Sequence, residues 1–298
     1  MRTGNIITKT KKNMWKVCFL VPALVLFTMI VYYPLVNSIK YSFTDWNMSS
    51  PSYDVVGFEN YKQIFQNTLI SAGMKNTAVF TIYTTFIGNF LALGLALILD
   101  SRIRAKKFLR AAFYIPCLLS PIVVSAIFSD ILQYKGLLNE AFRSMGLQML
   151  VNDWFGNEAT AMPLLIILNA WQWMGYGSVI YLAGLQTIPK EYHEAAAIDG
   201  AGKVTGFFKI TLPLLMPSIT IMTFMSITGG LKLFDIPYVL MNGGPNMATE
   251  TMGTVIYTLA FKYQRFGLAA AVSVVFFVII ATISILQVSI TKKREVQL

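Results

Sequence analysis

Residues 268–290 read LAAAVSVVFFVIIATISILQVSI, an uncharged run of 23 residues that is followed by Lys292 and Lys293. The hydrocarbon layer of a membrane is about 30 Å thick, so a helix that crosses it needs roughly 20 mostly apolar residues. Five more stretches of this kind precede it, at residues 18–36, 77–99, 111–132, 162–185 and 211–230. Asp130, near the end of one stretch, is the single charged residue among all six. The sequence therefore predicts six transmembrane helices.

The composition favours an all-α membrane protein. Of the 298 residues, 55% are hydrophobic and only 13% are charged, whereas about 25% charged residues is usual for soluble domains. No low-complexity linker divides the chain, so we expect a single membrane domain over residues 1–298. The one histidine, His193, excludes paired-histidine metal motifs, and no catalytic pair lies at membrane depth. We therefore expect no metal site and no enzyme activity. Cys18 and Cys117 lie in apolar runs and leave the redox compartment open.

The orientation follows from the basic residues, because cytoplasmic segments of membrane proteins are enriched in Lys and Arg. Sixteen of the 24 Lys and Arg residues lie in the two tails and in the second and fourth segments between predicted spans. Both termini are therefore expected in the cytoplasm, and the net charge of +10 reflects topology rather than nucleic-acid binding. The first apolar run is not followed by a small-residue cleavage site, so we expect it to remain as an anchor.

The fourth connecting segment, residues 186–210, contains a predicted short helix. Pro189 suits the first turn of a helix, and Gly200 is a natural C-terminal stop. A helix of about ten residues does not persist alone in water, so we expect this one to pack against another surface. A second short helix, at the membrane surface, is predicted over residues 59–65.

The spacing of Glu194-Ala195-Ala196, Gly200, Ile210 and Leu212-Pro213 resembles the EAA-loop signature of permease subunits in binding-protein-dependent ABC importers. The run FDIPYVL at 234–240, followed by NGGP at 242–245, is similar to the carbohydrate-importing branch of maltose and multiple-sugar types. The resemblance implies the type I ABC importer permease (MetI-like) fold in a bacterial-type inner or plasma membrane. It also implies a cytoplasmic coupling loop at 186–210 that docks on a separate ATPase. The coupling residues would be Glu191, Glu194, Ala195, Ala196, Asp199 and Gly200.

The same resemblance implies the partners. They are a second homologous permease subunit, two ATPase subunits and an extracytoplasmic sugar-binding protein. This chain would bind no cofactor, and the ATPase subunits would hydrolyse ATP with Mg²⁺. The segment Gly202-Lys203-Val204 is not a phosphate loop, because Ser or Thr does not follow the lysine and no strand precedes it.

One face of the fourth predicted span is polar. Asn169, Gln172, Trp173 and Tyr176 are spaced i, i+3, i+4 and i+7, which places them on the same side of a helix. Amides beside aromatic rings are typical of sugar sites, but they are also typical of helix packing in membranes. The resemblance favours substrate contact for these four residues and, in the fifth span, for Ser226, Gly229 and Gly230. Helix packing remains an alternative for the two glycines.

Two rival functions remain. A permease of the same ABC type could carry a non-sugar solute such as glycerol phosphate. An ion-coupled secondary transporter is disfavoured, because no ionisable residue lies in the middle of a span and no inverted repeat is evident. The sequence does not identify the sugar or the partner proteins. Nor does it show whether the substrate site lies on this subunit or mainly on its partner.

Overall fold

The computed structural model describes residues 19–47, 49–50, 52–101 and 103–296. Within these ranges the chain forms helices and loops, with one isolated antiparallel bridge between Thr44 and Val55. The predicted all-α fold is confirmed. Cys18, the predicted start of the first span, and the basic tail before it lie outside the described residues.

The chain divides into two compact units. The smaller unit comprises residues up to 64 together with 259–275, and the larger comprises 65–258 together with the residues from 276 onward. In chain order the elements are η1 (Thr28–Tyr32), α2 (Tyr33–Tyr41), α3 (Glu59–Gln66), α4 (Thr68–Asp100), α5 (Lys106–Leu118), α6 (Pro121–Leu132), α7 (Leu137–Ser144), η2 (Gln148–Leu150), α8 (Glu158–Thr187), α9 (Lys190–Ile198), α10 (Lys203–Gly206), η3 (Phe207–Thr211), α11 (Leu212–Leu214), α12 (Met216–Leu231), α13 (Asp235–Met241), α14 (Met252–Tyr257), η4 (Thr258–Lys262) and α15 (Phe266–Lys292).

Several helices have the length and composition to cross a membrane. Among the described residues these are Phe19–Tyr41, Thr68–Asp100, Pro121–Ser144 and Phe266–Lys292, with a bent pair, Lys203–Leu214 and Met216–Leu231, as a fifth candidate. Helix α8 has 30 residues, but polar residues such as Asn169 and Gln172 interrupt its apolar centre. The protein therefore has several membrane-spanning helices.

Two predicted spans are not single helices. The span predicted at 111–132 breaks between α5 and α6, where Ser120 is extended and its hydroxyl caps α6 by accepting from the Val123 N–H at 3.3 Å. The cause is Pro121, because a proline disfavours helical geometry at the residue before it. The span predicted at 211–230 bends by 69° between Leu214 and Met216. Pro217 has no N–H to donate to the carbonyl of Pro213, so the helix cannot continue regularly there.

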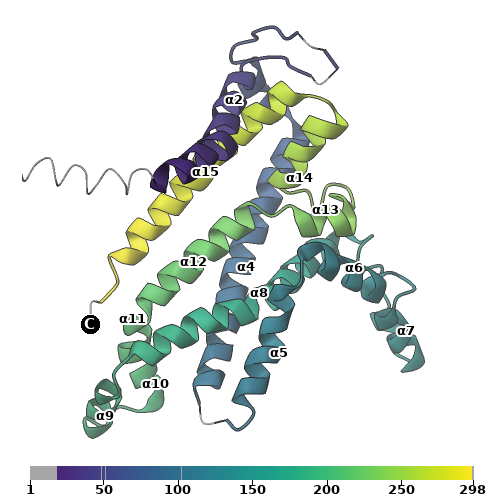
Figure 1. Ribbon diagram of the computed structural model, residues 1–298. Coiled ribbons are helices and arrows are strands. Elements are labelled where there is room, and N and C mark those ends of the chain that lie inside the picture. Colours follow the sequence, from purple (N-terminus) through teal and green to yellow (C-terminus); the bar gives the residue numbers. More distant parts are fainter. Residues whose placement is uncertain (1–18, 48, 51, 102, 297–298) are drawn as a thin grey trace, which may run out of the picture. The chain divides into compact units, whose positions relative to one another are not determined.

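The core of the larger unit lies where α4, α8 and α12 pack together (Figure 1). Small residues allow the close approach, as is usual for helices packed in membranes. A β-carbon on Gly177 of α8 would lie 2.8 Å from the Ala92 β-carbon of α4 and 2.8 Å from the Met222 methyl of α12. A second core cluster surrounds Phe80 and Leu165. These contacts fix the inner faces of the three helices.

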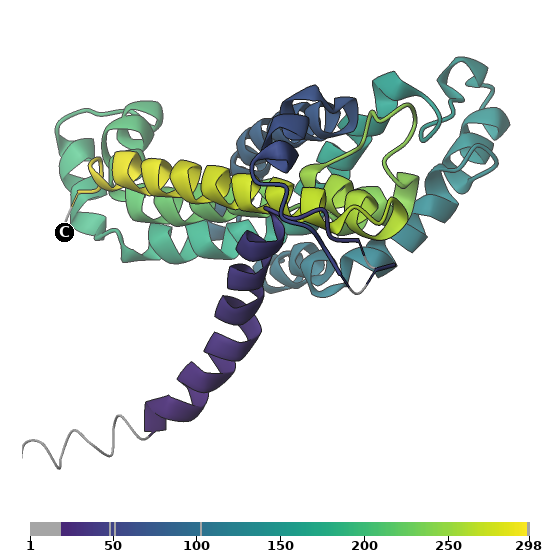
Figure 2. The ribbon, with the colours of Figure 1, turned by 90° about the horizontal axis from the view of Figure 1, so that it is seen from above.

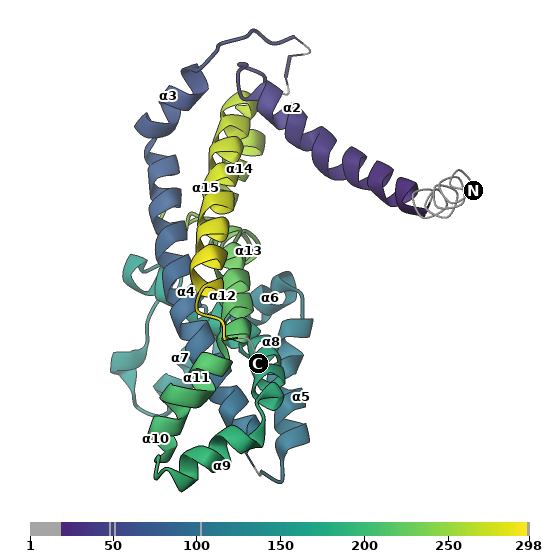
Figure 3. The ribbon, with the colours of Figure 1, turned by 90° about the vertical axis from the view of Figure 1, so that its left-hand side faces the viewer.

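Within the larger unit, the connections alternate between two ends. Helices α9 and α10 and the turn between α4 and α5 lie at one end, and α13, α6 and α7 lie toward the other (Figures 1 and 3). Figure 2 shows the same separation from above, with α9 and α10 at the left and α7 at the right. The basic start of α5, residues 106–110, therefore lies on the same side of this unit as α9 and α10.

The smaller unit is held by a buried amide. Asn60 of α3 donates to the carbonyls of Ser42 at 3.0 Å and Thr44 at 2.7 Å. The predicted short helix over residues 59–65 is confirmed as α3. Gly267 packs against the carbonyl of Thr44 and donates its N–H to the Trp46 carbonyl at 3.0 Å. These contacts tie the chain before α3 to the first turn of α15.

Candidate functional site

A cavity of about 570 Å³ lies in the larger unit among α4, α8, α12 and the start of α13. From α8 it is lined by Asn169, Trp173 and Tyr176, and from α12 by Ser226, Gly229 and Gly230. The structure thus brings six of the seven predicted substrate residues together.

The α8 wall combines a free amide with aromatic rings. Asn169 is half-buried and makes no hydrogen bond with any described residue, so both ends of its amide are available to a ligand. The Trp173 side chain is 44% exposed, and its ring lies edge-on to that of Tyr176 with centroids 6.0 Å apart. The Tyr176 hydroxyl donates to the sulfur of Met225 at 3.6 Å. This wall offers hydrogen-bonding groups beside an exposed ring face.

Gln172 does not belong to this wall. It is fully buried, and its amide nitrogen donates to the Leu119 carbonyl at 3.2 Å, at the break between α5 and α6. The helix end leaves that carbonyl without a regular partner, so the glutamine supplies one. The placement of Gln172 on a common substrate face with Asn169 is therefore corrected, because its amide bonds to the carbonyl of Leu119, directly after α5, and Gln172 does not line the cavity.

The α12 wall is open at one glycine and tightly packed at the next. Nothing lies within 4 Å of a β-carbon built on Gly229, whereas one built on Gly230 would lie 2.9 Å from the Thr81 hydroxyl and 3.0 Å from the Thr81 Cα. Gly230 thus lets α4 and α12 approach each other. Helix packing was the alternative for both glycines. The contacts support it for Gly230, whereas Gly229 is open.

The outer part of the cavity includes residues that the substrate pattern did not contain. Phe234 lines it and stacks on Tyr238, with ring centroids 5.0 Å apart. A hydrogen bond with Tyr257 raises the pKa of Tyr238 above its ordinary value. Lys232 and Asp235 also line the cavity and are exposed, and no ion pair joins them in the described chain. The aromatic content of residues 234–238 was the available sequence signal.

The segment predicted for coupling, residues 186–210, contributes no residue to the cavity lining. Helix α9 begins after Pro189, and none of its residues is buried. It ends at Ile198, and Gly200 follows the C-cap residue Asp199 with a φ of +76°, which suits glycine. Ala201 and Gly200 donate their N–H groups to the carbonyls of Ala196 and Ala197 at 2.9 and 3.1 Å. The predicted helix and its glycine stop are confirmed. All six predicted coupling residues lie on or directly after this helix, at Glu191, Glu194, Ala195, Ala196, Asp199 and Gly200.

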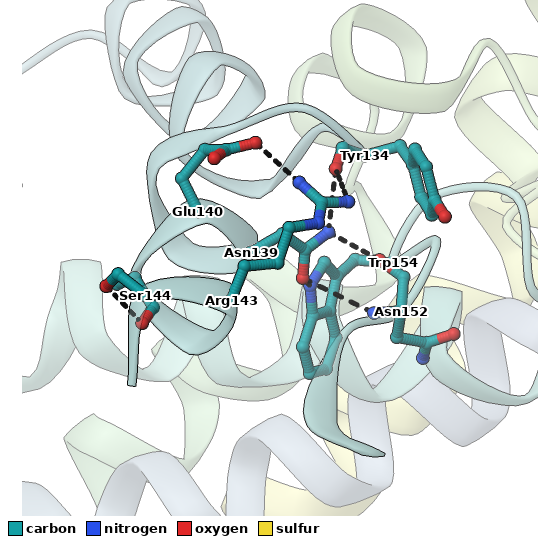
Figure 4. A network of polar contacts seen from close by, with 8 residues as sticks. Tyr134, Asn139, Glu140, Arg143, Ser144, Asn152 and Trp154 are labelled. Atoms are coloured by element: carbon teal, nitrogen blue, oxygen red, sulfur yellow. Dashed lines mark hydrogen bonds and ion pairs between the residues drawn. The ribbon is translucent and has the colours of Figure 1, made fainter. Parts of the chain in front are cut away.

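The segment between α6 and α8 is organised around Asn139 (Figure 4). This side chain is fully buried and donates to the carbonyls of Tyr134 at 3.1 Å and Asn152 at 2.8 Å. Its oxygen accepts from the Asn152 N–H and from the Trp154 indole at 3.0 Å. Arg143 binds Glu140 at 2.5 Å and the Tyr134 carbonyl at 3.2 Å. The network ties the residues before, within and after α7 to one another.

Chemically, the cavity presents groups that can bind a polar organic molecule. No group of three His, Cys, Asp or Glu residues in the described part of the chain is arranged to hold a metal ion. The cavity offers an amide, hydroxyls and aromatic rings, which bind polar organic molecules by hydrogen bonds and stacking, together with the charged side chains of Lys232 and Asp235.

Comparisons with known proteins agree with this geometry. Residues 88–296 match the family model described as binding-protein-dependent transport system inner membrane component. The chain is 34% identical over 290 residues to the multiple sugar-binding transport system permease protein MsmF of Streptococcus mutans, covering 97% of this chain and 99% of that relative. It is 32% identical to the arabinooligosaccharides transport system permease protein AraP of Bacillus subtilis, covering 92% of this chain and 87% of that relative.

A solved structure shares the fold. It is a chain of a bacterial ABC transporter involved in the import of the acidic polysaccharide alginate, with a TM-score of 0.83 and 22% identity, covering 97% of this chain and 99% of that one. The MetI-like importer fold is therefore confirmed. The family consists of transport permeases and not of enzymes, and the match covers most of this chain, so the chain belongs to the family of binding-protein-dependent transport system inner membrane components.

Proposed function

We propose that this chain is the membrane-spanning permease subunit of an ATP-driven sugar importer and forms half of its translocation pathway. The observation that carries this proposal is the cavity on α8. Asn169 and Tyr176 each lie 11 residues from the nearer end of this 30-residue helix, which is about 17 Å along its axis. The binding groups therefore lie near the middle of a helix long enough to cross the membrane.

The chemistry of the cavity favours a neutral, hydroxyl-rich ligand. The Asn169 amide can donate and accept, as a sugar hydroxyl requires, and Trp173 offers a ring face on which a pyranose can stack. Lys232 contributes a positive charge to the cavity lining and Asp235 a negative one. Because the carboxylate offsets the positive charge, binding of a phosphate ester is not favoured. The names of the relatives agree, since MsmF is named for multiple sugars and AraP for arabinooligosaccharides. We propose substrate contact for Asn169, Trp173, Tyr176, Ser226 and Gly229, and helix packing against α4 for Gly230.

We infer a single membrane domain with six spans and both termini in the cytoplasm of a bacterial cell. The span that includes α8 is counted because of its length, and the broken pairs α5–α6 and α11–α12 each count as one span. Alternation of the connections between two ends of the larger unit supports this count. The excess of Lys and Arg in the segments around 101–110 and 186–210 supports the orientation.

Helix α9 is proposed to dock on a separate ATPase subunit. It has nine residues, none of them buried, and presents the side chains of Tyr192 and Ile198 to solvent, the latter 87% exposed. A free helix of this length is marginal in water, so docking would stabilise it. We propose two ATPase subunits that hydrolyse ATP with Mg²⁺, a second homologous permease and an extracytoplasmic sugar-binding protein as the partners.

The test is uptake by the complete assembly in proteoliposomes. Radiolabelled raffinose, maltotriose and arabinotriose serve as sugar probes, and glycerol 3-phosphate and histidine as other solutes. We expect ATP-dependent uptake of at least one sugar and of neither other solute. Import of glycerol 3-phosphate or histidine without any sugar would refute the sugar assignment.

A matched pair of variants tests the cavity. Trp173→Ala removes a ring that lines it, whereas Trp171→Ala removes a ring on the same helix that packs edge-on against Phe128 and does not line it. Loss of one aromatic contact should raise the KM for sugar uptake about fivefold in Trp173→Ala. The KM of Trp171→Ala should stay within about twofold of the parental value, because no ligand contact is lost. Equal effects of the two variants would mean that the cavity is not the substrate site.

A further inference from the structure

Four hydroxyl groups line the cavity, and they differ in what their protons do. Thr84 and Thr228 donate to the carbonyls of Phe80 and Phe224 in their own helices, both at 2.7 Å. Tyr176 donates to the Met225 sulfur. Ser226 donates to no group in the described part of the chain, and its oxygen instead accepts a hydrogen bond from Asn89 at 3.2 Å. Its proton is therefore available to the cavity.

The orientation of the Asn89 amide follows from its neighbours. One amide hydrogen is given to the Thr85 carbonyl at 2.6 Å and the other to Ser226. A flipped amide would place its oxygen against the Thr85 carbonyl, where two acceptors would repel each other. The amide oxygen must then face the Tyr181 hydroxyl, which lies 2.5 Å away and donates to it. A directed chain of hydrogen bonds thus runs from Tyr181 through Asn89 to Ser226.

This chain connects three helices. Tyr181 of α8 is 1% exposed, and with Asn89 of α4 it lines a second cavity of about 450 Å³ that does not include Ser226. Ser226 of α12 lines the first cavity and not the second. Asn89 therefore bonds to Ser226 in the wall of the first cavity but does not itself line that cavity.

We propose that Asn89, held by Tyr181, is a positioning residue that sets the hydrogen-bond polarity of Ser226. Asn89 engages one lone pair of the Ser226 hydroxyl and leaves its proton unengaged, so Ser226 meets the ligand chiefly as a donor and favours an acceptor oxygen there, such as the ring or glycosidic oxygen of a sugar. This specificity rests on the proposed function, since it assumes that the cavity binds the transported solute. The polarity itself is a property of the chain alone.

A thiol in place of the serine tests the polarity without any ligand. In the assembled transporter carrying Cys18→Ala and Cys117→Ala, the added variant Ser226→Cys is alkylated with iodoacetamide across a range of pH. An N–H that donates to the sulfur stabilises the thiolate, so adding Asn89→Leu should raise the midpoint of the pH profile by about one unit. Thr228→Cys is the matched control, because Asn89 does not bond to Thr228. An equal shift at both positions, or none at Ser226→Cys, would overturn the proposal.

A double-mutant cycle on uptake tests the consequence for the ligand. Maltotriose, raffinose and arabinotriose are the probes, and Ser226→Ala should raise the KM of the imported sugar about fivefold, as expected for one lost hydrogen bond. If Asn89 acts through Ser226, Asn89→Leu should raise the KM in the parental chain and add less than about twofold in Ser226→Ala. With Thr228→Val the effects should multiply. Multiplication with Ser226→Ala as well would make Asn89 a packing residue only.

The two measurements separate the possible failures. If no sugar is imported but the thiol midpoint shifts at Ser226→Cys alone, the proposed function fails and the polarity of Ser226 stands. If a sugar is imported and the midpoint does not shift, the sugar function stands and the role of Asn89 is refuted.

Discussion

Replacement of Gly175 by alanine should separate α5 from α8. A β-carbon at this position would fall directly on the carbonyl group of Phe113 and 2.9 Å from the Tyr114 Cα, where ordinary contacts begin at 3.4 Å. Both neighbours are backbone atoms and cannot rotate away, so α5 must shift. Overpacking of this kind costs up to about 3 kcal/mol, and the better helix propensity of alanine returns about 1 kcal/mol. The expected net loss of stability is therefore about 2 kcal/mol.

Thermal unfolding of the detergent-purified chain measures this loss. A loss of about 2 kcal/mol corresponds to a Tm lower by about 6 °C for a chain of this size. The Tm is measured from the fraction of protein that stays monodisperse after heating. Gly229→Ala is the matched control, because a β-carbon there has nothing within 4 Å. Its Tm should not fall and should rise by about 3 °C through helix propensity. A Tm of Gly175→Ala within about 1 °C of the parental Tm, on the order of the assay's error, would refute the close packing of α5 against α8 at Gly175.

Three further outcomes are expected. Gly200→Val should abolish sugar-stimulated ATP hydrolysis while leaving membrane insertion intact, because valine is strained at a φ of +76°. The control, Gly202→Val, should retain this activity, because the φ of Gly202 is −70°. Normal sugar-stimulated ATP hydrolysis in Gly200→Val would refute the docking role of α9. Asn169→Leu should raise the KM for sugar uptake about fivefold, whereas Gln172→Leu should change it less than about twofold, because the Gln172 amide bonds to the Leu119 carbonyl and does not line the cavity. A larger effect of Gln172→Leu than of Asn169→Leu would place Gln172 in the substrate site. Single cysteines should report the orientation, with labelling from inside only at Ser101 and Lys190 and from outside at Ser52, Asn157 and Asn246.

Features that depend on a few neighbouring residues were predictable from the sequence. The apolar runs were visible because span length is set by membrane thickness. The stop of α9 just before Gly200 was predictable because the positive φ of this glycine is a local property of the backbone. The polar face of α8 was visible because helical periodicity places Asn169, Trp173 and Tyr176 on one side of any helix.

Features that depend on neighbouring helices were decided by the tertiary structure. Pro121 and Pro217 signal a possible interruption, but whether a helix breaks or only bends depends on partners for the freed backbone groups, such as Gln172 for the Leu119 carbonyl. Gly229 and Gly230 are equivalent in sequence, yet Thr81 of α4 packs against one and leaves the other open to the cavity. Likewise, periodicity places Gln172 beside Asn169, and only the position of α5 turns its amide away. Periodicity defines the faces of a helix, whereas what each face meets depends on contacts between residues far apart in the chain.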